Sequence, residues 1–326
     1  MDLFKIIRDI EQVDPEIYDR LDSRRRVFRH FGLAGKALTA AAMPALVSGV
    51  FQRAYGQGTA LPAPIVEVLN LALSLEYLEF YFYDNGLTVP NLIPTADRPA
   101  FEVIRNDESG HIKVLRGALG SAAIPAPDRN LFDYSGGRGT QAGPFADVFI
   151  AYARFLGVAQ SFVDTGVRAY KGGAPILMPN KDILDAALNI HSVEARHSSH
   201  VRTVRRGQAA GQSGPGATGV LGDTTNLNQR PKSWISGNDN GGPSPGTMPS
   251  TADVYGPGSP ATGAADAVFF PAEGNVSQAG RDITTISGGA AVSVNLASEA
   301  FDEPLDAGTV KRIARNFVVQ TSMLFT

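Results

Sequence analysis

Residues 108–111 read Glu-Ser-Gly-His and residues 194–197 read Glu-Ala-Arg-His, so the chain carries two Glu-x-x-His motifs. Each motif lies on the apolar stripe of a segment with helical spacing. Because residues three apart share one face of a helix, each motif brings a carboxylate and an imidazole together. A buried ionised glutamate is unfavourable unless it is paired, hydrogen-bonded or bound to a cation. Two such motifs indicate a metal site in a helical core, with solvated surface pairs as the alternative.

Four apolar segments with helical spacing surround these motifs, and proline and glycine separate them. We expect helices over residues 65–85, after the capping sequence at 95–99, over residues 144–170, and from about residue 180 to 206. Four amphipathic helices of similar length predict a four-helix bundle, in a chain that is mainly α.

The chain divides by composition into residues 1–57, 58–210 and 211–326. The first region contains Ser-Arg-Arg-Arg-Val-Phe-Arg at 23–29, followed by an uncharged run over residues 37–52. Paired arginines with Phe28 two positions beyond them resemble a twin-arginine export signal, which implies a periplasmic or extracellular location. The run is shorter than the ~20 residues of a spanning helix, so we expect no permanent membrane span. An amphipathic N-terminal helix is the alternative, and cleavage is left open.

The third region is rich in Gly, Ser, Pro, Thr and Asn up to about residue 300. We expect a loop-rich extension with a few short strands, for example over residues 291–296, and a short closing helix over residues 307–317. Disorder is the competing interpretation. Trp234 and Tyr255 favour docking of parts of this region instead.

Composition narrows the classes of partner and site. The net charge of −3 provides no general attraction to nucleic acid or to an anionic membrane. The chain has no cysteine, which excludes disulfides, thiolate metal sites and a cysteine nucleophile. A metal would therefore need His, Asp or Glu as ligands, a set that suits iron, manganese or zinc.

Several of these motifs together resemble the ferritin-like superfamily. They are Leu-Glu-Tyr-Leu-Glu-Phe-Tyr-Phe-Tyr at 75–83 and the two Glu-x-x-His motifs, in that order. The segments at 158–160, 164–167, 191–197 and 299–305 are similar to exported ferritin-like proteins related to desiccation-associated proteins. The resemblance implies a ferritin-like four-helix bundle with these metal ligands: Glu76, Glu108, His111, Glu194 and His197.

The third helix departs from the family pattern. Val163 stands where a glutamate is expected, and Asp164 and Gln160 lie one register away as substitute ligands. Aspartate is shorter and sits about 100 degrees round the helix, so a complete two-metal site is in doubt. The other residues that we place near the centre, in supporting roles, are Glu79, Tyr83 and His191.

Other polar residues of the bundle have simpler interpretations. We expect Tyr83 and Tyr152 to pack inward with a partner for each hydroxyl group. His200 is expected at the surface. Arg202, Arg205 and Arg206 are expected at a solvated helix end, where positive charge complements the helix dipole.

These observations favour an exported protein that binds one or two iron or manganese ions, with zinc as another candidate. Oxidant-related redox chemistry, as in a di-metal carboxylate oxidoreductase, is one interpretation. A non-enzymatic surface assembly protein with a degraded, empty site is the alternative, and a single structural zinc or manganese ion is a third. We expect a homo-oligomer or surface assembly as the form of the protein.

Overall fold

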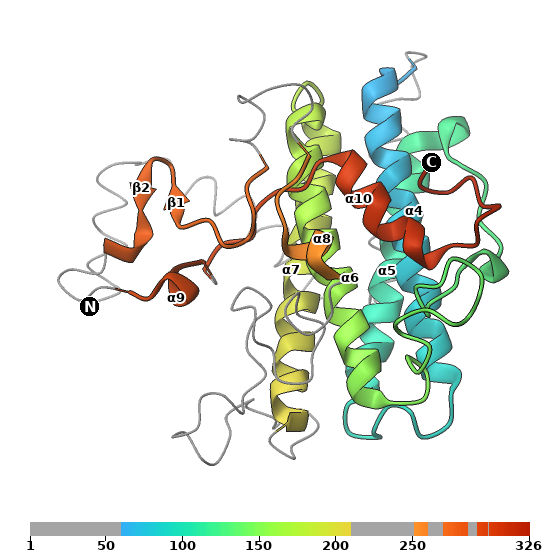
Figure 1. The fold of residues 1–326 in the computed structure, drawn as a ribbon. Coiled ribbons are helices and arrows are strands. Elements are labelled where there is room, and N and C mark those ends of the chain that lie inside the picture. The colour runs from blue at the N-terminus through green and yellow to red at the C-terminus, as the bar shows by residue number, and fades with distance from the viewer. Residues whose placement is uncertain (1–59, 210–250, 260–269, 286–291, 299) are drawn as a thin grey trace, which may run out of the picture. The chain divides into compact units, whose positions relative to one another are not determined.

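The computed structural model describes residues 60–209, 251–259, 270–285, 292–298 and 300–326. Its elements carry the labels of Figure 1. The export-signal sequence, Trp234 and most of the Gly-rich stretch lie outside the described residues. No helix among the described residues is both long and apolar enough to cross a membrane.

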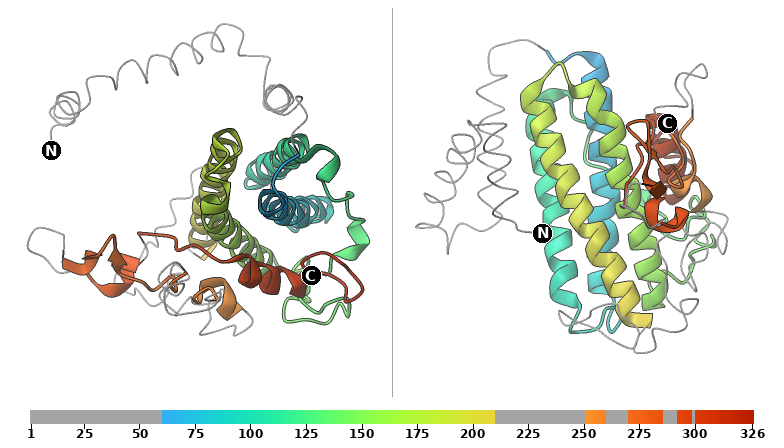
Figure 2. Two further views of the ribbon diagram at one scale, coloured as in Figure 1. Left: turned by 90° about the horizontal axis from the view of Figure 1, so that it is seen from above. Right: turned by 90° about the vertical axis from the view of Figure 1, so that its left-hand side faces the viewer.

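Four long helices form a bundle, as predicted. They are α4 (Ala63–Thr88), α5 (Arg98–Leu119), α6 (Tyr152–Leu177) and α7 (Lys181–Ala209). Helix α4 pairs with α5 and α6 pairs with α7, while α4 also packs on α6 and α5 on α7. Figure 2 shows the four helices side by side, nearly end-on in its left view. The core of the bundle therefore receives side chains from all four helices.

Local sequence explains where these helices begin. Proline occupies the first turn of both α4 and α5, where its missing N–H costs no intrahelical hydrogen bond. Before α7, Asn180 Oδ1 accepts a hydrogen bond from the Ile183 amide at 3.2 Å. This bond satisfies one of the free amides at the helix N-terminus.

The third helix begins later than we predicted. Residues 144–150 form turns, in which the amide of Val148 bonds to Phe145 O and that of Ile150 bonds to Asp147 O. Phe149 in this segment packs against Phe82 with ring centroids 5.7 Å apart. This segment is apolar because it is a loop that packs on the core, and from periodicity alone we predicted a helix there. The helix also continues through Pro175 to Leu177.

The C-terminal extension contains several short elements. They are α8 (Ala252–Tyr255), β1 (Ser277–Gln278), β2 (Arg281–Asp282), α9 (Val294–Ser298) and α10 (Ala307–Ala314), with 3-10 turns η7 (Ile283–Thr285) and η8 (Arg315–Phe317). Two further 3-10 turns, η1 (Gly120–Ala122) and η2 (Arg129–Leu131), lie in the connection between α5 and α6. Strands β1 and β2 form an antiparallel hairpin, and α10 with η8 confirms the closing helix. The strand suggested at 291–296 is wrong over its described part, because α9 is helical from Val294.

Arg168 of α6 holds the extension on the bundle, and sequence analysis did not identify it. Its guanidinium is fully buried and pairs with Glu273 Oε1 at 3.0 Å. It also donates hydrogen bonds to the carbonyl oxygens of Val254, Gly256 at 3.0 Å and Glu303 at 2.7 Å. One arginine therefore joins three separate segments of the extension to a single turn of α6.

Candidate metal centre

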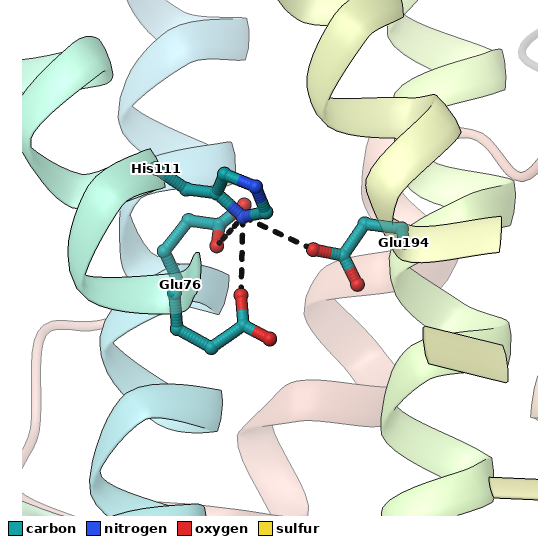
Figure 3. A group of neighbouring side chains, drawn as sticks. Glu76, His111 and Glu194 are labelled. Carbon is teal, nitrogen blue, oxygen red and sulfur yellow. Dashed lines mark hydrogen bonds and ion pairs between the residues drawn. The ribbon is translucent and has the colours of Figure 1, made fainter. Parts of the chain in front are cut away.

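The five ligands expected from the sequence meet inside the bundle. Glu76 projects from α4, Glu108 and His111 from α5, and Glu194 and His197 from α7, and all five are buried. Ligand atoms of Glu76, Glu108, His111 and Glu194 lie within 4.8 Å of one another. Figure 3 shows Glu76, His111 and Glu194 converging from their separate helices. The spacing within each Glu-x-x-His motif places both members on the inward face of its helix.

Three carboxylates point at one nitrogen of His111. Its Nδ1 lies 3.0 Å from Glu76 Oε2, 3.1 Å from Glu108 Oε2 and 3.2 Å from Glu194 Oε1. A ring nitrogen carries at most one proton, so it cannot donate to all three carboxylates at once. This convergence of oxygen atoms is the arrangement that a cation would stabilise.

His197 faces the other oxygens of the same two glutamates. Its Nδ1 lies 3.1 Å from Glu108 Oε1 and 3.7 Å from Glu194 Oε2. The opposite ring nitrogen, Nε2, lies 3.1 Å from Asp107 Oδ2, which fixes the orientation of the ring. Glu108 and Glu194 therefore each direct one oxygen toward His111 and one toward His197.

Burial and charge set the protonation of this cluster. Burial raises the pKa of Glu76 to about 8, although His111 acts in the opposite direction. Burial alone would lower the pKa of His197, but the charge of Glu108 and the hydrogen bond with Asp107 raise it to about 12. The pKa of His111 is also raised, against burial, chiefly by the charge of Glu76. The pKa of Glu108 is lowered because the two histidines outweigh its burial.

Several polar atoms of the centre make no well-directed hydrogen bond in the described structure, although each lies 3.1 to 3.7 Å from a histidine nitrogen or a carboxylate oxygen. They are both carboxylate oxygens of Glu194, Glu108 Oε1 and His197 Nδ1, all buried. An unsatisfied buried carboxylate oxygen is costly, and a metal ion would satisfy several of them at once. The mixed oxygen and nitrogen donor set fits iron, manganese or zinc. The residues present therefore fit a transition-metal ion.

Tyr170 supports the centre from α6, and sequence analysis did not select it. Its hydroxyl group donates a hydrogen bond to Glu76 Oε1. Tyr170 follows Val163 by seven residues, two helical turns along the same face. This seven-residue spacing is the sequence signal that could have identified Tyr170 as a neighbour of the centre. Val163 itself is fully buried in the hydrophobic core.

The two proposed substitute ligands on α6 take part in a different network. Asp164 Oδ1 accepts hydrogen bonds from Ser198 Oγ and from Arg202, both at 2.7 Å. Gln160 Oε1 accepts a hydrogen bond from Arg205. The solvated helix end expected for these arginines is therefore wrong for Arg202 and Arg205, since buried acceptors on α6 bind both of them. The side chain of Arg206 is outside the described residues.

The other tyrosine, histidine and glutamate side chains that we expected near the centre differ in burial and in hydrogen bonding. Glu79 and Tyr83 are buried, and the Tyr83 hydroxyl group has no hydrogen-bond partner in the described structure, contrary to our expectation. Tyr152 does donate a hydrogen bond to Asp97 Oδ2 at 2.9 Å. His191 is half-buried, and burial lowers its pKa. His200, expected at the surface, is half-buried, and its ring lies against Phe101 with centroids 6.2 Å apart.

Comparison with known families agrees with this geometry. Residues 65–207 match the family model described as ferritin-like domain. Comparisons with curated proteins and with solved structures find no match. The matched segment spans nearly all of α4 to α7 and includes all five converging ligands. These four helices therefore form a ferritin-like bundle.

Proposed function

We propose that this protein binds iron or manganese in the bundle core through Glu76, Glu108, His111, Glu194 and His197. The observation that carries the proposal is the position of Glu108 and Glu194 between the two histidines. Each carboxylate directs one oxygen toward His111 and the other toward His197, with 3.1 to 3.7 Å between each oxygen and the Nδ1 atom that it faces. Carboxylates placed in this way can serve two ligand sets at once.

The chain's own residues would hold and orient the site. Asp107 fixes the ring of His197, and Tyr170 positions the carboxylate of Glu76 by a hydrogen bond. The centre is enclosed by buried side chains of four helices, which limits the access of water. When bound, iron or manganese would supply Lewis acidity and redox capacity at this position. Oxidant-related chemistry is therefore the activity that we propose to test.

Elemental analysis tests the proposal. We would reconstitute metal-free full-length protein with Fe(II) or Mn(II) without oxygen and compare it with a Glu108→Gln plus Glu194→Gln variant. We expect metal in the parent protein and none in the variant. Glu102→Gln is the control, because Glu102 lies on α5 but is partly exposed and pairs with Arg98. A folded parent protein that retains no metal would overturn the proposal.

Export is a separate part of the proposed function. We infer from residues 23–29 that a twin-arginine pathway carries the protein to the periplasm or beyond. Folding before export would allow the metal to be loaded in the cytoplasm. Replacing Arg25 and Arg26 with lysine should retain the protein inside the cell. Equal export of both forms would contradict this inference.

A non-enzymatic assembly protein is the second candidate. The absence of an acidic side chain from α6 at the described cluster favours it. The extension held by Arg168 would then provide a surface for self-association. An oligomer that survives the loss of both Glu108 and Glu194, in a protein without redox activity, would support this candidate. Stress-related function of the desiccation-associated group remains a proposal that rests on sequence resemblance.

A further inference from the structure

Glu79 is a buried carboxylate to which the proposed function assigns no role. It follows Glu76 by three residues on α4 and shares its inward face. Its side chain is buried, and Oε2 has no hydrogen-bond partner in the described structure. A buried carboxylate without a partner is destabilising unless a proton or a cation compensates its charge.

Gly166 of α6 shows where Glu79 is directed. A β-carbon built on Gly166 would lie 3.3 Å from Glu79 Oε1 and 3.4 Å from Glu194 Oε2. Both oxygens therefore flank the same point of the α6 backbone. The Glu194 oxygen concerned is the one that faces His197, while its other oxygen faces His111. Glu79 thus lies on the His197 side of the centre.

The centre consequently has two halves that share Glu108 and Glu194. The first half has Glu76 with His111, at 3.0 Å. The second has His197 with a carboxylate position that family resemblance assigns to α6. In this chain α6 has Val163 there, and Gly166, one helical turn further along the same face, lies beside the carboxylates of Glu79 from α4 and Glu194 from α7.

We propose that Glu79 is the missing carboxylate ligand of the His197 half, so that the centre holds two ions. Gly166 leaves the space that the Glu79 carboxylate occupies. A β-carbon at Gly166 would lie 3.3 Å from Glu79 Oε1, which is tighter than ordinary van der Waals contact, and 3.4 Å from Glu194 Oε2, which is at the lower limit of ordinary contact. Glu79 on α4 would then take the place of the carboxylate ligand that α6 lacks. This inference rests on the proposed function.

Metal stoichiometry and magnetic coupling test the inference. Full-length metal-free protein would be loaded with Mn(II), and both metal content and the electron paramagnetic resonance spectrum would be measured. We expect two ions per chain with a spin-coupled spectrum in the parent protein. Glu79→Gln should retain one ion with an uncoupled spectrum. Glu67→Gln, an exposed position on the same helix, should behave as the parent.

Two further variants keep the test decisive if Glu79→Gln folds poorly. Glu79→Asp retains the charge but shortens the reach, and it should lose the second ion. Gly166→Ala retains every carboxylate but crowds Glu79, and it should weaken binding of the second ion at least tenfold while the first is unaffected.

The outcomes separate the two proposals. Two coupled ions in Glu79→Gln would overturn the role of Glu79. A parent protein with one ion per chain would also overturn it, while metal binding by the centre would stand. A folded parent protein with no ion would overturn the proposed function itself.

Discussion

Metal uptake by the bundle should depend steeply on pH between pH 6 and pH 7. In the metal-free centre the pKa of His197 is about 12 and that of Glu76 is about 8, and the pKa of His111 is raised. All three groups therefore hold a proton in this range. Each must release it before it can act as a ligand, so protons compete with the metal ion and affinity falls as pH falls.

The size of this effect follows from the number of protons released. One proton changes the apparent association constant about tenfold per pH unit, or about 1.4 kcal/mol. Because several coupled groups release protons, filling the whole centre should depend on pH more steeply than tenfold per pH unit. Glu108 contributes little, because its lowered pKa keeps it ionised throughout.

Titration calorimetry with Mn(II) measures both quantities. The same titration in buffers of different ionisation enthalpy counts the protons released, and repeating it at pH 6 and pH 7 provides the change in affinity. Glu102→Gln should leave both unchanged. An affinity that does not vary over this range, with no proton release, would refute the protonation that we derive or the role of these residues as ligands.

Three other predictions concern stability and support of the centre. Arg168→Met leaves Glu273 buried without its partner, so it should lower the free energy of unfolding by about 3–5 kcal/mol in urea denaturation. Arg312→Met removes an exposed ion pair and should lower it by less than about 1 kcal/mol, so equal losses in the two variants would contradict the reasoning. Tyr170→Phe removes the hydrogen bond to Glu76 and should weaken metal binding about tenfold without unfolding the bundle; unchanged affinity would show that Tyr170 only packs. Free Mn(II) at 100 times the dissociation constant of a site should raise the free energy of unfolding by about 2.7 kcal/mol for each ion bound. An unfolding midpoint that does not change after chelation would contradict binding to the native state.

Much of the bundle could be predicted because its signals are local. Helical periodicity, proline in the first turns and turn residues identified four helices, and they placed the starts of α4, α5 and α7 within a few residues of the observed ones. The same reasoning failed at Phe149, where an apolar side chain in a turn fills the aromatic core. Periodicity reports which residues are buried, and a loop that packs on the core carries the same signal as a short helix.

The two Glu-x-x-His motifs were also readable from sequence, since the spacing of three residues determines a shared helix face. The contacts of Tyr170, Arg168 and Glu79 were not. Tyr170 meets Glu76 across 94 positions, and Arg168 meets Glu303 across 135. Glu79 was placed in a supporting role, and only the space at Gly166 shows which half of the centre it faces.

Sequence alone thus determined the helices, the inward faces and the kind of ligand, because these depend on neighbours within one or two helical turns. Tertiary structure decided which carboxylates share a histidine, which tyrosine holds Glu76 and where the extension binds. Those contacts depend on the rotation and offset of one helix against another. These are set by side-chain packing over the whole bundle, so no local pattern encodes them.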